Sequence, residues 1–309
     1  MELHARAVSM GPATAKSSHG KREEIDVTSL HFDVFTKMLG CGSFGVVREC
    51  VCRGNGEHYA VKSIKKGSAS SNVFLWTEVQ MLSLAQKHEC ILELMMTVED
   101  SAHIHIVTEI CKGTTLHEAI VNAAVRNCPG YEFPEKLAAR IAWSVLSAAK
   151  HMHSRNVVHC DITIENIIVD MEREALRGLK LIDFGNAQIH KEGDPQLTEF
   201  GGNMMYMSPQ VLSRRYDRAR DVWATGTVIC TVLCGRHPFD AYSREEMTSA
   251  IKSGAYDTDT VAWERITDKG KDFVARLLEK DSKVRLSAPS ALNHLWFEQT
   301  GCKTFAIDE

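Results

Sequence analysis

One stretch of the chain places polar residues directly before a short β-branched run: Val158-His159-Cys160-Asp161-Ile162-Thr163-Ile164-Glu165-Asn166-Ile167-Ile168-Val169. The run at its end predicts a β-strand. Further along, another apolar run ends in Asp183-Phe184-Gly185. Strand ends and tight loops would therefore bring Asp161, Asn166 and Asp183 into one small region. An isolated Asp or Asn in a loop is usually a turn former, so a chemical role for these residues depends on the rest of the chain.

The composition predicts a soluble globular protein with one large domain or two lobes. The chain has 309 residues, of which 44% are hydrophobic and 25% are charged, and its net charge is -4. This charge gives no reason to expect nucleic acid or a membrane surface as the main partner. No apolar run approaches the roughly 20 residues that cross a bilayer, so we expect no membrane span. The ten cysteines form no paired Cys-x-x-Cys pattern, which favours reduced thiols in a cytoplasmic protein.

A glycine-rich segment near the N-terminus predicts a tight hairpin. Residues 1–28 show no periodicity and are expected to form a flexible tail. Gly40, Gly42 and Gly45 then allow a backbone to approach a phosphate closely. Many tight hairpins carry glycines, so this pattern alone is weak evidence. The flanking residues favour strand-turn-strand, unlike the strand-turn-helix of a dinucleotide-binding fold.

The next strand and helix contain one lysine and one glutamate that could pair. Lys62 lies in an alternating strand, where a lysine is most often a solvent-facing residue. The small Ala60 beside it would admit a flat ring, and Lys62 could reach a phosphate under the hairpin. Glu78 lies in a helix expected over 74–84 and could bind Lys62, although the simpler interpretation is an exposed helix glutamate.

The remaining pattern indicates a sheet followed by helices. Strands expected over 91–96 and 104–110 complete a sheet of about five strands. From Leu116 the chain is expected to be mainly helical, with helices over 137–153, from Asp221 through Leu233, and over 268–279 and 288–295. The long polar span from Gly185 to Gly202 is typical of a functional or mobile loop.

Taken together, these motifs resemble the eukaryotic protein kinase domain over about residues 31–300. The Gly40–Gly45 segment is similar to the phosphate-covering loop, and Ala60-Val61-Lys62 is similar to the strand that carries the nucleotide lysine. Within that family, Val46–Cys50 and the run from Arg285 to Phe297 resemble the calcium/calmodulin-dependent and calcium-dependent (CAMK) group.

The resemblance implies an α+β fold with two lobes: a small five-stranded β lobe with one helix, and a larger, mainly helical lobe. We expect the kinase domain over 29–300, with an N-lobe at about 31–111, a C-lobe at about 112–300 and a C-terminal tail over 301–309.

The resemblance also implies roles for individual residues, with ATP and Mg²⁺ as cofactors. Asp161 would orient a substrate hydroxyl and accept its proton, and Asn166 and Asp183 would hold Mg²⁺. Lys62, held by Glu78, would contact the phosphates. The other residues expected at the nucleotide are Leu39, Gly40, Cys41, Gly42, Ser43, Phe44, Gly45, Val47, Ala60, Thr108, Glu109, Cys111, Glu165 and Ile168.

Two departures from the family pattern bear on catalysis. Cys160 replaces the arginine that pairs with a phosphate on the loop, so we expect phosphorylation at Thr198 not to switch the domain by the usual route. Thr163 replaces the lysine that contacts the moving phosphoryl group, and Asn203 stands where its hydrogen-bonded threonine would be. Losing such a cation would cost roughly 10²–10³ in rate.

Two further departures bear on stability and specificity. Gln210 replaces the glutamate whose partner would be Arg285, which weakens an anchoring pair. Thr115 stands where arginine-directed kinases place an acidic residue, while Glu165 keeps the other acidic contact.

These observations leave two functions open. The first is an active serine/threonine kinase acting on protein substrates, with reduced activity. The second is a pseudokinase that serves as a nucleotide-binding scaffold or regulatory module. We expect calcium or calmodulin control not to be encoded in this chain. No Asp-x-Asp-x-Asp-Gly calcium loop occurs in it, and no basic amphipathic calmodulin-target helix follows Phe297.

Overall fold

The computed structural model describes residues 32–42, 45–67, 69–127, 133–172 and 175–302. They form two compact units. The smaller contains the described residues up to Gln86 together with Leu92–Cys111, and the larger contains Lys87–Ile91 and the described residues from Lys112 onward. The expected N-terminal tail lies outside the described residues. Only Gly301 and Cys302 of the expected C-terminal tail are described.

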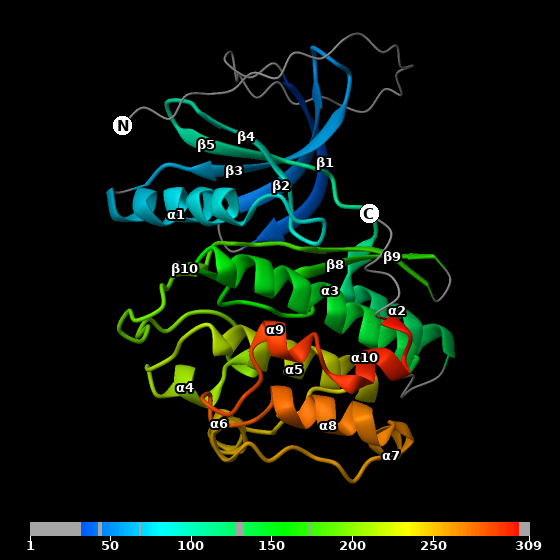
Figure 1. The fold of residues 1–309 in the computed structure, drawn as a ribbon. Helices are drawn as coiled ribbons and strands as arrows, with labels where there is room; N and C mark the ends of the chain where they lie inside the picture. The colour runs from blue at the N-terminus through cyan, green and yellow to red at the C-terminus, as the bar shows by residue number, and fades with distance from the viewer. Residues whose placement is uncertain (1–31, 43–44, 68, 128–132, 173–174, 303–309) are drawn as a thin grey trace. The chain divides into compact units, whose positions relative to one another are not determined.

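The smaller unit is a five-stranded antiparallel sheet with the order β1-β2-β3-β5-β4. Its strands are β1 (Phe32–Gly42), β2 (Gly45–Cys52), β3 (His58–Lys65), β4 (Leu94–Glu99) and β5 (His103–Thr108). Between β3 and β4 the chain forms α1 (Ala69–Ala85), which lies along one face of the sheet (Figure 1). The α+β architecture expected from the sequence is therefore confirmed.

Alternation along the strands gives this sheet two apolar faces. Ile64, Ile104 and Ile106 form a buried cluster that Val79 of α1 packs against. The other face buries Phe32, Val34, Cys50, Val61 and Val107.

A polar network braces the hairpin between β4 and β5. Asp100 Oδ1 accepts hydrogen bonds from the backbone nitrogens of Ala102 and His103, and Asp100 Oδ2 lies 2.9 Å from His105 Nε2. The other ring nitrogen of His105 lies 2.9 Å from Ser63 Oγ. Both carboxylate oxygens and both His105 nitrogens are thus occupied, which identifies the network as a structural element of the hairpin.

The larger unit is mainly helical. Its core pairs α3 (Glu135–Ser154) with α5 (Ala219–Cys234), and α5 also packs against α8 (Asp268–Leu277). A Cβ added at Gly226 of α5 would lie 2.8 Å from Leu277 Cβ, so glycine permits this close approach. The other elements are α2 (Leu116–Asn127), the 3₁₀ helix η1 (Met204–Tyr206), α4 (Pro209–Leu212), α6 (Arg244–Ser253), α7 (Val261–Arg265), α9 (Ala288–Ala291) and α10 (Leu295–Gln299).

Two small sheets carry the loops of this unit. One has the order β6-β8-β9, from β6 (Thr114–Thr115), β8 (Ile167–Glu172) and β9 (Ala175–Leu181). The other pairs β7 (Val157–Val158) with β10 (Gln188–Ile189). Residues 159–166 therefore join β7 to β8, and the strand expected after Asn166 is confirmed.

Two expected elements differ in the structure. The strand expected over 91–96 begins only at Leu94, because Ile91 forms a parallel bridge with Leu181 of β9. The helix expected over 288–295 is two short helices, α9 and α10. His294 interrupts it with an extended backbone and caps α10 by accepting a hydrogen bond from Trp296 N.

Candidate active site

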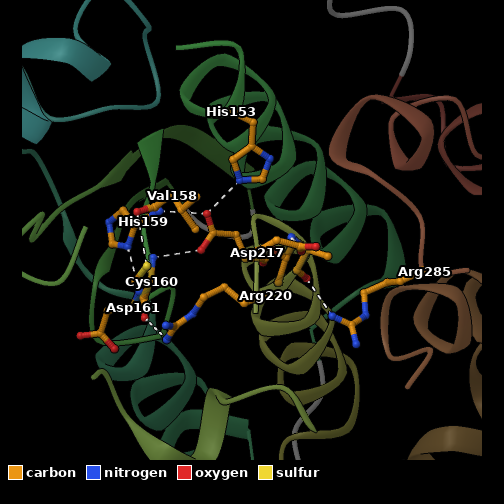
Figure 2. A network of polar contacts seen from close by, with 11 residues as sticks. His153, Val158, His159, Cys160, Asp161, Asp217, Arg220 and Arg285 are labelled. Carbon is orange, nitrogen blue, oxygen red and sulfur yellow. Dashed lines mark hydrogen bonds and ion pairs between the residues drawn. The ribbon is translucent and has the colours of Figure 1, made fainter. Parts of the chain in front are cut away.

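The loop of His159, Cys160 and Asp161 (Figure 2) is held by Asp221, whose side chain is buried. Asp221 Oδ2 accepts from His159 N at 2.9 Å, and Oδ1 accepts from Cys160 N at 3.0 Å. Cys160 has φ +68°, a left-handed conformation that residues other than Gly, Asn and Asp rarely adopt. Two hydrogen bonds to a buried carboxylate therefore fix the backbone immediately before Asp161.

His153 of α3 supplies a third contact to Asp221, with its Nε2 2.9 Å from Oδ2. Burial by itself raises the pKa of Asp221, but the hydrogen bonds and charge of its partners, His153 above all, hold the pKa below its ordinary value. Asp221 is consequently a buried carboxylate that stays ionised.

The His159 ring connects this loop to the segment that contains Asp183. Its Nδ1 accepts from Asp161 N at 3.3 Å, and its Nε2 donates to the carbonyl of Ile182 at 3.2 Å. Burial lowers the pKa of His159 despite the nearby carboxylates, in agreement with a neutral ring that donates from one nitrogen only. The ring also packs edge-on against Phe184, with 4.8 Å between centroids.

Three donors fix the carboxylate of Asp161. Asn166 Nδ2 and Asn186 Nδ2 donate to Oδ2 at 3.2 and 3.1 Å, and Asn203 N donates to Oδ1 at 3.0 Å. Asn186 was not among the expected site residues. Its position directly after Asp183-Phe184-Gly185 was the only signal for it in the sequence.

Asn166 and Asp183 are brought together by the backbone. Ile182 N donates to the carbonyl oxygen of Asn166 at 2.9 Å, so Asp183 follows directly beside it. Asn166 uses its side-chain nitrogen for Asp161, at 3.0 Å from the backbone oxygen, and this leaves the amide oxygen for another partner. Asp183 Oδ1 accepts from Gly185 N at 3.1 Å. One carboxylate and one amide oxygen form a donor set that suits Mg²⁺.

In the smaller unit, Lys62 and Glu78 form the ion pair expected from the sequence. Lys62 Nζ lies 2.7 and 2.9 Å from the two oxygens of Glu78, and both side chains are largely buried. By strand register Lys62 lies opposite Val47, and Ala60 lies opposite Thr108, so these four share one face of the sheet.

The remaining expected nucleotide residues divide between the units. The smaller carries Leu39, Gly40, Cys41 and Gly42 at the end of β1, Gly45 at the start of β2, and Glu109 and Cys111 after β5; the larger carries Glu165 and Ile168. Ser43 and Phe44 lie outside the described residues.

The residues that replace the family pattern have local structural roles. Cys160 is buried, and burial raises the pKa of its thiol to about 12. Thr163 Oγ1 accepts from Asn166 N at 3.2 Å. Asn203 Oδ1 caps η1 by accepting from Met205 N. Among the described residues Thr163 and Asn203 form no hydrogen bond with each other, so each has become part of a separate turn.

Two other replacements are accommodated by new contacts. Gln210 Oε1 accepts from Arg285 Nη2 at 2.9 Å, as expected, and Gln210 Nε2 donates to the carbonyl of Lys280 at 2.6 Å. Thr115 Oγ1 accepts from Glu118 N, and Glu118 Oε2 accepts from Thr115 N. The reciprocal pair is a capping box for α2.

Comparison with known proteins places the chain in a family. The chain matches the protein kinase domain family over residues 34–297. It is 33% identical over 271 residues to calcium-dependent protein kinase 7 of Arabidopsis thaliana, which covers 87% of this chain and 49% of that protein. It is 31% identical over 263 residues to calcium-dependent protein kinase SK5 of Glycine max, covering 84% and 50% respectively.

The chain spans about half the length of these curated relatives. No helix among the described residues is long and apolar enough to cross a membrane. The match covers both compact units and includes Lys62, Glu78, Asp161, Asn166 and Asp183, and the chain belongs to the protein kinase domain family.

Proposed function

We propose that the chain is a serine/threonine protein kinase of the CAMK type that transfers the γ-phosphoryl group of MgATP to protein substrates. One observation carries this proposal: the Asp161 carboxylate is fixed through both oxygens by Asn166, Asn186 and Asn203. Phosphoryl transfer needs positioned charge more than covalent chemistry, and a carboxylate fixed in this way suits the orientation of a hydroxyl nucleophile.

Proton transfer and neutralisation of phosphate charge give each polar residue of the site a role in this reaction. Asp161 would accept the proton of the substrate hydroxyl as its oxygen bonds to phosphorus. Lys62, oriented by Glu78, would neutralise phosphate charge on the nucleotide. Asn166 and Asp183 would hold Mg²⁺, which supplies neutralisation of charge on the phosphates when it is bound.

Substrate preference is proposed from the surface of the catalytic loop. Glu165 is exposed and could attract a basic side chain of the substrate. Thr115, by contrast, is occupied in capping α2 and offers no negative charge. We therefore propose only a weak preference for basic residues near the phosphorylated hydroxyl. We also propose that these 309 residues do not themselves sense calcium, because they contain no Asp-x-Asp-x-Asp-Gly loop.

We propose a cytoplasmic location on chemical grounds. Cys50, Cys90 and Cys160 are buried and form no disulfide. Burial raises the pKa of their thiols to about 12, 11 and 12, so all three are protonated and unreactive at neutral pH. Such thiols suit a reducing compartment.

One observation favours a nucleotide-binding pseudokinase as the second candidate. The hydroxyl of Thr163 turns into the loop backbone, so this position offers no cation to a phosphoryl group. The cost in rate would be roughly 10²–10³, which slows a kinase without abolishing it.

A phosphate-transfer assay with γ-labelled ATP, Mg²⁺ and a mixture of basic peptides separates the two candidates. Asp161→Asn is the matched control, since it removes the proton acceptor and keeps a similar shape. We expect transfer above this variant, and phosphoamino-acid analysis should give phosphoserine or phosphothreonine. Transfer equal to that of Asp161→Asn, with ATP binding retained in a thermal-shift assay, would establish the pseudokinase instead.

A further inference from the structure

Arg220 of α5 is a charged residue in an unusual position. Only 5% of it is exposed, and its guanidinium group lies over the Tyr216 ring at 4.6 Å from the centroid. Arginine is seldom buried in this way unless its donors are used, so its contacts indicate what it does.

Arg220 joins two separate loops through one nitrogen. Its Nη2 donates to the carbonyl of Cys160 at 2.5 Å, which precedes Asp161 (Figure 2). The same nitrogen donates to the carbonyl of Gly201 at 3.1 Å. Gly201 belongs to residues 185–208, which we call the activation segment. The guanidinium group therefore ties this segment to the catalytic loop.

The next residue shows how closely the two loops approach. Gly202 has φ +89°, and a Cβ added there would lie 2.7 Å from the Cys160 carbonyl oxygen and 3.4 Å from Arg220 Nη2. Arg220 thus reaches a point where only glycine fits, and the segment is packed against the loop.

Every second residue of the activation segment from Leu197 to Asn203 is attached to the rest of the larger unit by a hydrogen bond. The backbone of Leu197 pairs with Tyr216, and Tyr216 Oη donates to the carbonyl of Glu199 at 2.8 Å. Arg220 then holds Gly201, and Asp161 accepts from Asn203 N. Thr198, between the first two, is exposed. All four attachments join groups of the protein chain itself.

The arrangement carries a cost that packing does not explain. Arg220 Nη1 is buried and has no partner among the described residues. A buried donor without a partner lowers stability, and an apolar side chain would avoid that loss. An apolar residue at this position could not make the two hydrogen bonds that join the catalytic loop to the activation segment.

We propose that Arg220 is a positioning residue that keeps the activation segment ordered against the catalytic loop in the unphosphorylated protein. It acts through Cys160 and Gly201, and it takes over the task that an arginine at position 160 would perform with a phosphate. Its effect on catalysis rests on the proposed kinase function, but its effect on the order of the segment does not.

Hydrogen exchange of the phosphatase-treated 309-residue chain tests this proposal directly. Arg220→Met retains the length of the side chain and removes its donors, and Arg215→Met, at an exposed arginine nearby, is the matched control. We expect Arg220→Met to speed exchange of the Asn203 amide, which donates to Asp161 Oδ1, by about tenfold or more in the peptide over residues 199–203. This is the effect of losing a hydrogen bond to a charged donor. In Arg220→Met, the exchange rates of α3 and α8 should match those of wild type. In Arg215→Met, the exchange rates of all segments should match those of wild type.

A second measurement separates positioning from a merely structural role. If the protein transfers phosphate, Arg220→Met should lower kcat and leave KM for ATP unchanged, and Arg220→Lys should recover part of kcat. The proposal would be overturned if residues 199–203 exchanged no faster in Arg220→Met than in the unphosphorylated wild type. If Arg220→Met does not fold, Arg220→Lys is measured instead, and we expect exchange over 199–203 to be faster than in Arg215→Met but by less than tenfold, because lysine keeps one donor and loses the planar guanidinium group. Exchange no faster than that of Arg215→Met would then overturn the proposal. A wild type without transferase activity would refute the proposed function alone, because exchange still decides the role of Arg220.

Discussion

Asp221 Oδ1 accepts a hydrogen bond from the backbone nitrogen of Cys160 at 3.0 Å and thereby holds a strained residue in place. The left-handed conformation of Cys160, with φ +68°, costs roughly 1–2 kcal/mol for a residue with a Cβ. Asp161 is the next residue, so relaxation of this strain would move its carboxylate. The position of the proposed proton acceptor therefore depends on a carboxylate sixty residues away in the sequence.

Asp221→Asn should destabilise the protein strongly. An amide offers one acceptor, so its NH₂ group would face the backbone nitrogen of His159 or Cys160 and leave a buried donor without a partner. We expect a loss of about 3 kcal/mol in the free energy of unfolding, measured by urea denaturation. Asp33→Asn, which alters a partly exposed ion pair with Arg53, should cost less than about 1 kcal/mol. Equal losses in the two variants would contradict the role of Asp221.

Gly202→Ala and Gly201→Ala should behave differently although the residues are adjacent. At Gly202 a Cβ would lie 2.7 Å from the Cys160 carbonyl oxygen and 3.0 Å from Asp161 Oδ1, at φ +89°. At Gly201 the nearest atom is Asn186 Oδ1 at 3.3 Å, and the backbone is not left-handed. We expect Gly202→Ala to reduce transfer by at least about tenfold, since about 1–2 kcal/mol of strain falls on the loop itself. Initial rates of both variants, measured side by side, would disprove this if Gly201→Ala were the more impaired.

Local patterns predicted the parts of the site that depend on single elements. The strand of Lys62 and the helix of Glu78 follow from their patterns. The ion pair between them was indicated by the resemblance to protein kinases, because each local pattern by itself favoured an exposed residue. The sequence around Thr115 carries a further local signal. The spacing Thr115-x-x-Glu118 is a capping-box pattern, and it identifies a helix start without reference to substrate.

Contacts between distant segments could not be predicted in the same way. Arg220 lies on a helix where periodicity cannot distinguish an exposed arginine from a buried one, and its partner Cys160 is sixty residues away. Ile91 belongs to an apolar run that predicts a strand, yet its neighbour is Leu181, which no local pattern indicates. In both cases tertiary packing decided a position for which sequence propensity gave only a weak preference.

Glu78→Gln should impair activity far more than stability. The amide cannot hold Lys62 Nζ with two charged contacts, so the ammonium group would lose its orientation. We expect kcat/KM for ATP to fall roughly 10–10²-fold in steady-state assays. Glu99→Gln breaks a more exposed ion pair with Lys66 in the same unit and should leave kcat/KM within about twofold of wild type. A similar decrease in both variants would show that the loss reflects general damage to the sheet.

His237 should make the larger unit sensitive to acid. Burial lowers the pKa of His237 to about 4, against the opposing charge of Asp240, compared with 6.5 for an ordinary histidine. The unfolded chain therefore binds more protons than the folded one between these values, and stability falls as the pH drops from 6.5 to 4. His237→Phe should reduce this decline by up to about 1.4 kcal/mol per pH unit, measured by urea denaturation at several pH values. An unchanged slope would contradict the assignment.

Thr163→Lys should raise the transfer rate if the rest of the site is competent. Thr163 is buried, and its hydroxyl serves only the turn, by accepting from Asn166 N. A lysine would lose this bond, at a cost of about 1 kcal/mol in stability, and would add a cation two residues after Asp161. We expect kcat to rise by up to about 10²-fold, the reverse of removing one positioned donor.

Thr163→Val is the control for that gain, because it loses the same hydrogen bond without adding charge. It should show the loss of stability and no increase in kcat. A faster lysine variant beside an unimproved valine variant would mean that Lys62, Asp161, Asn166 and Asp183 are already competent and that one cation limits the rate. Lysine and valine variants with the same kcat would mean that position 163 does not limit transfer, and the slow step would then lie in another part of the site.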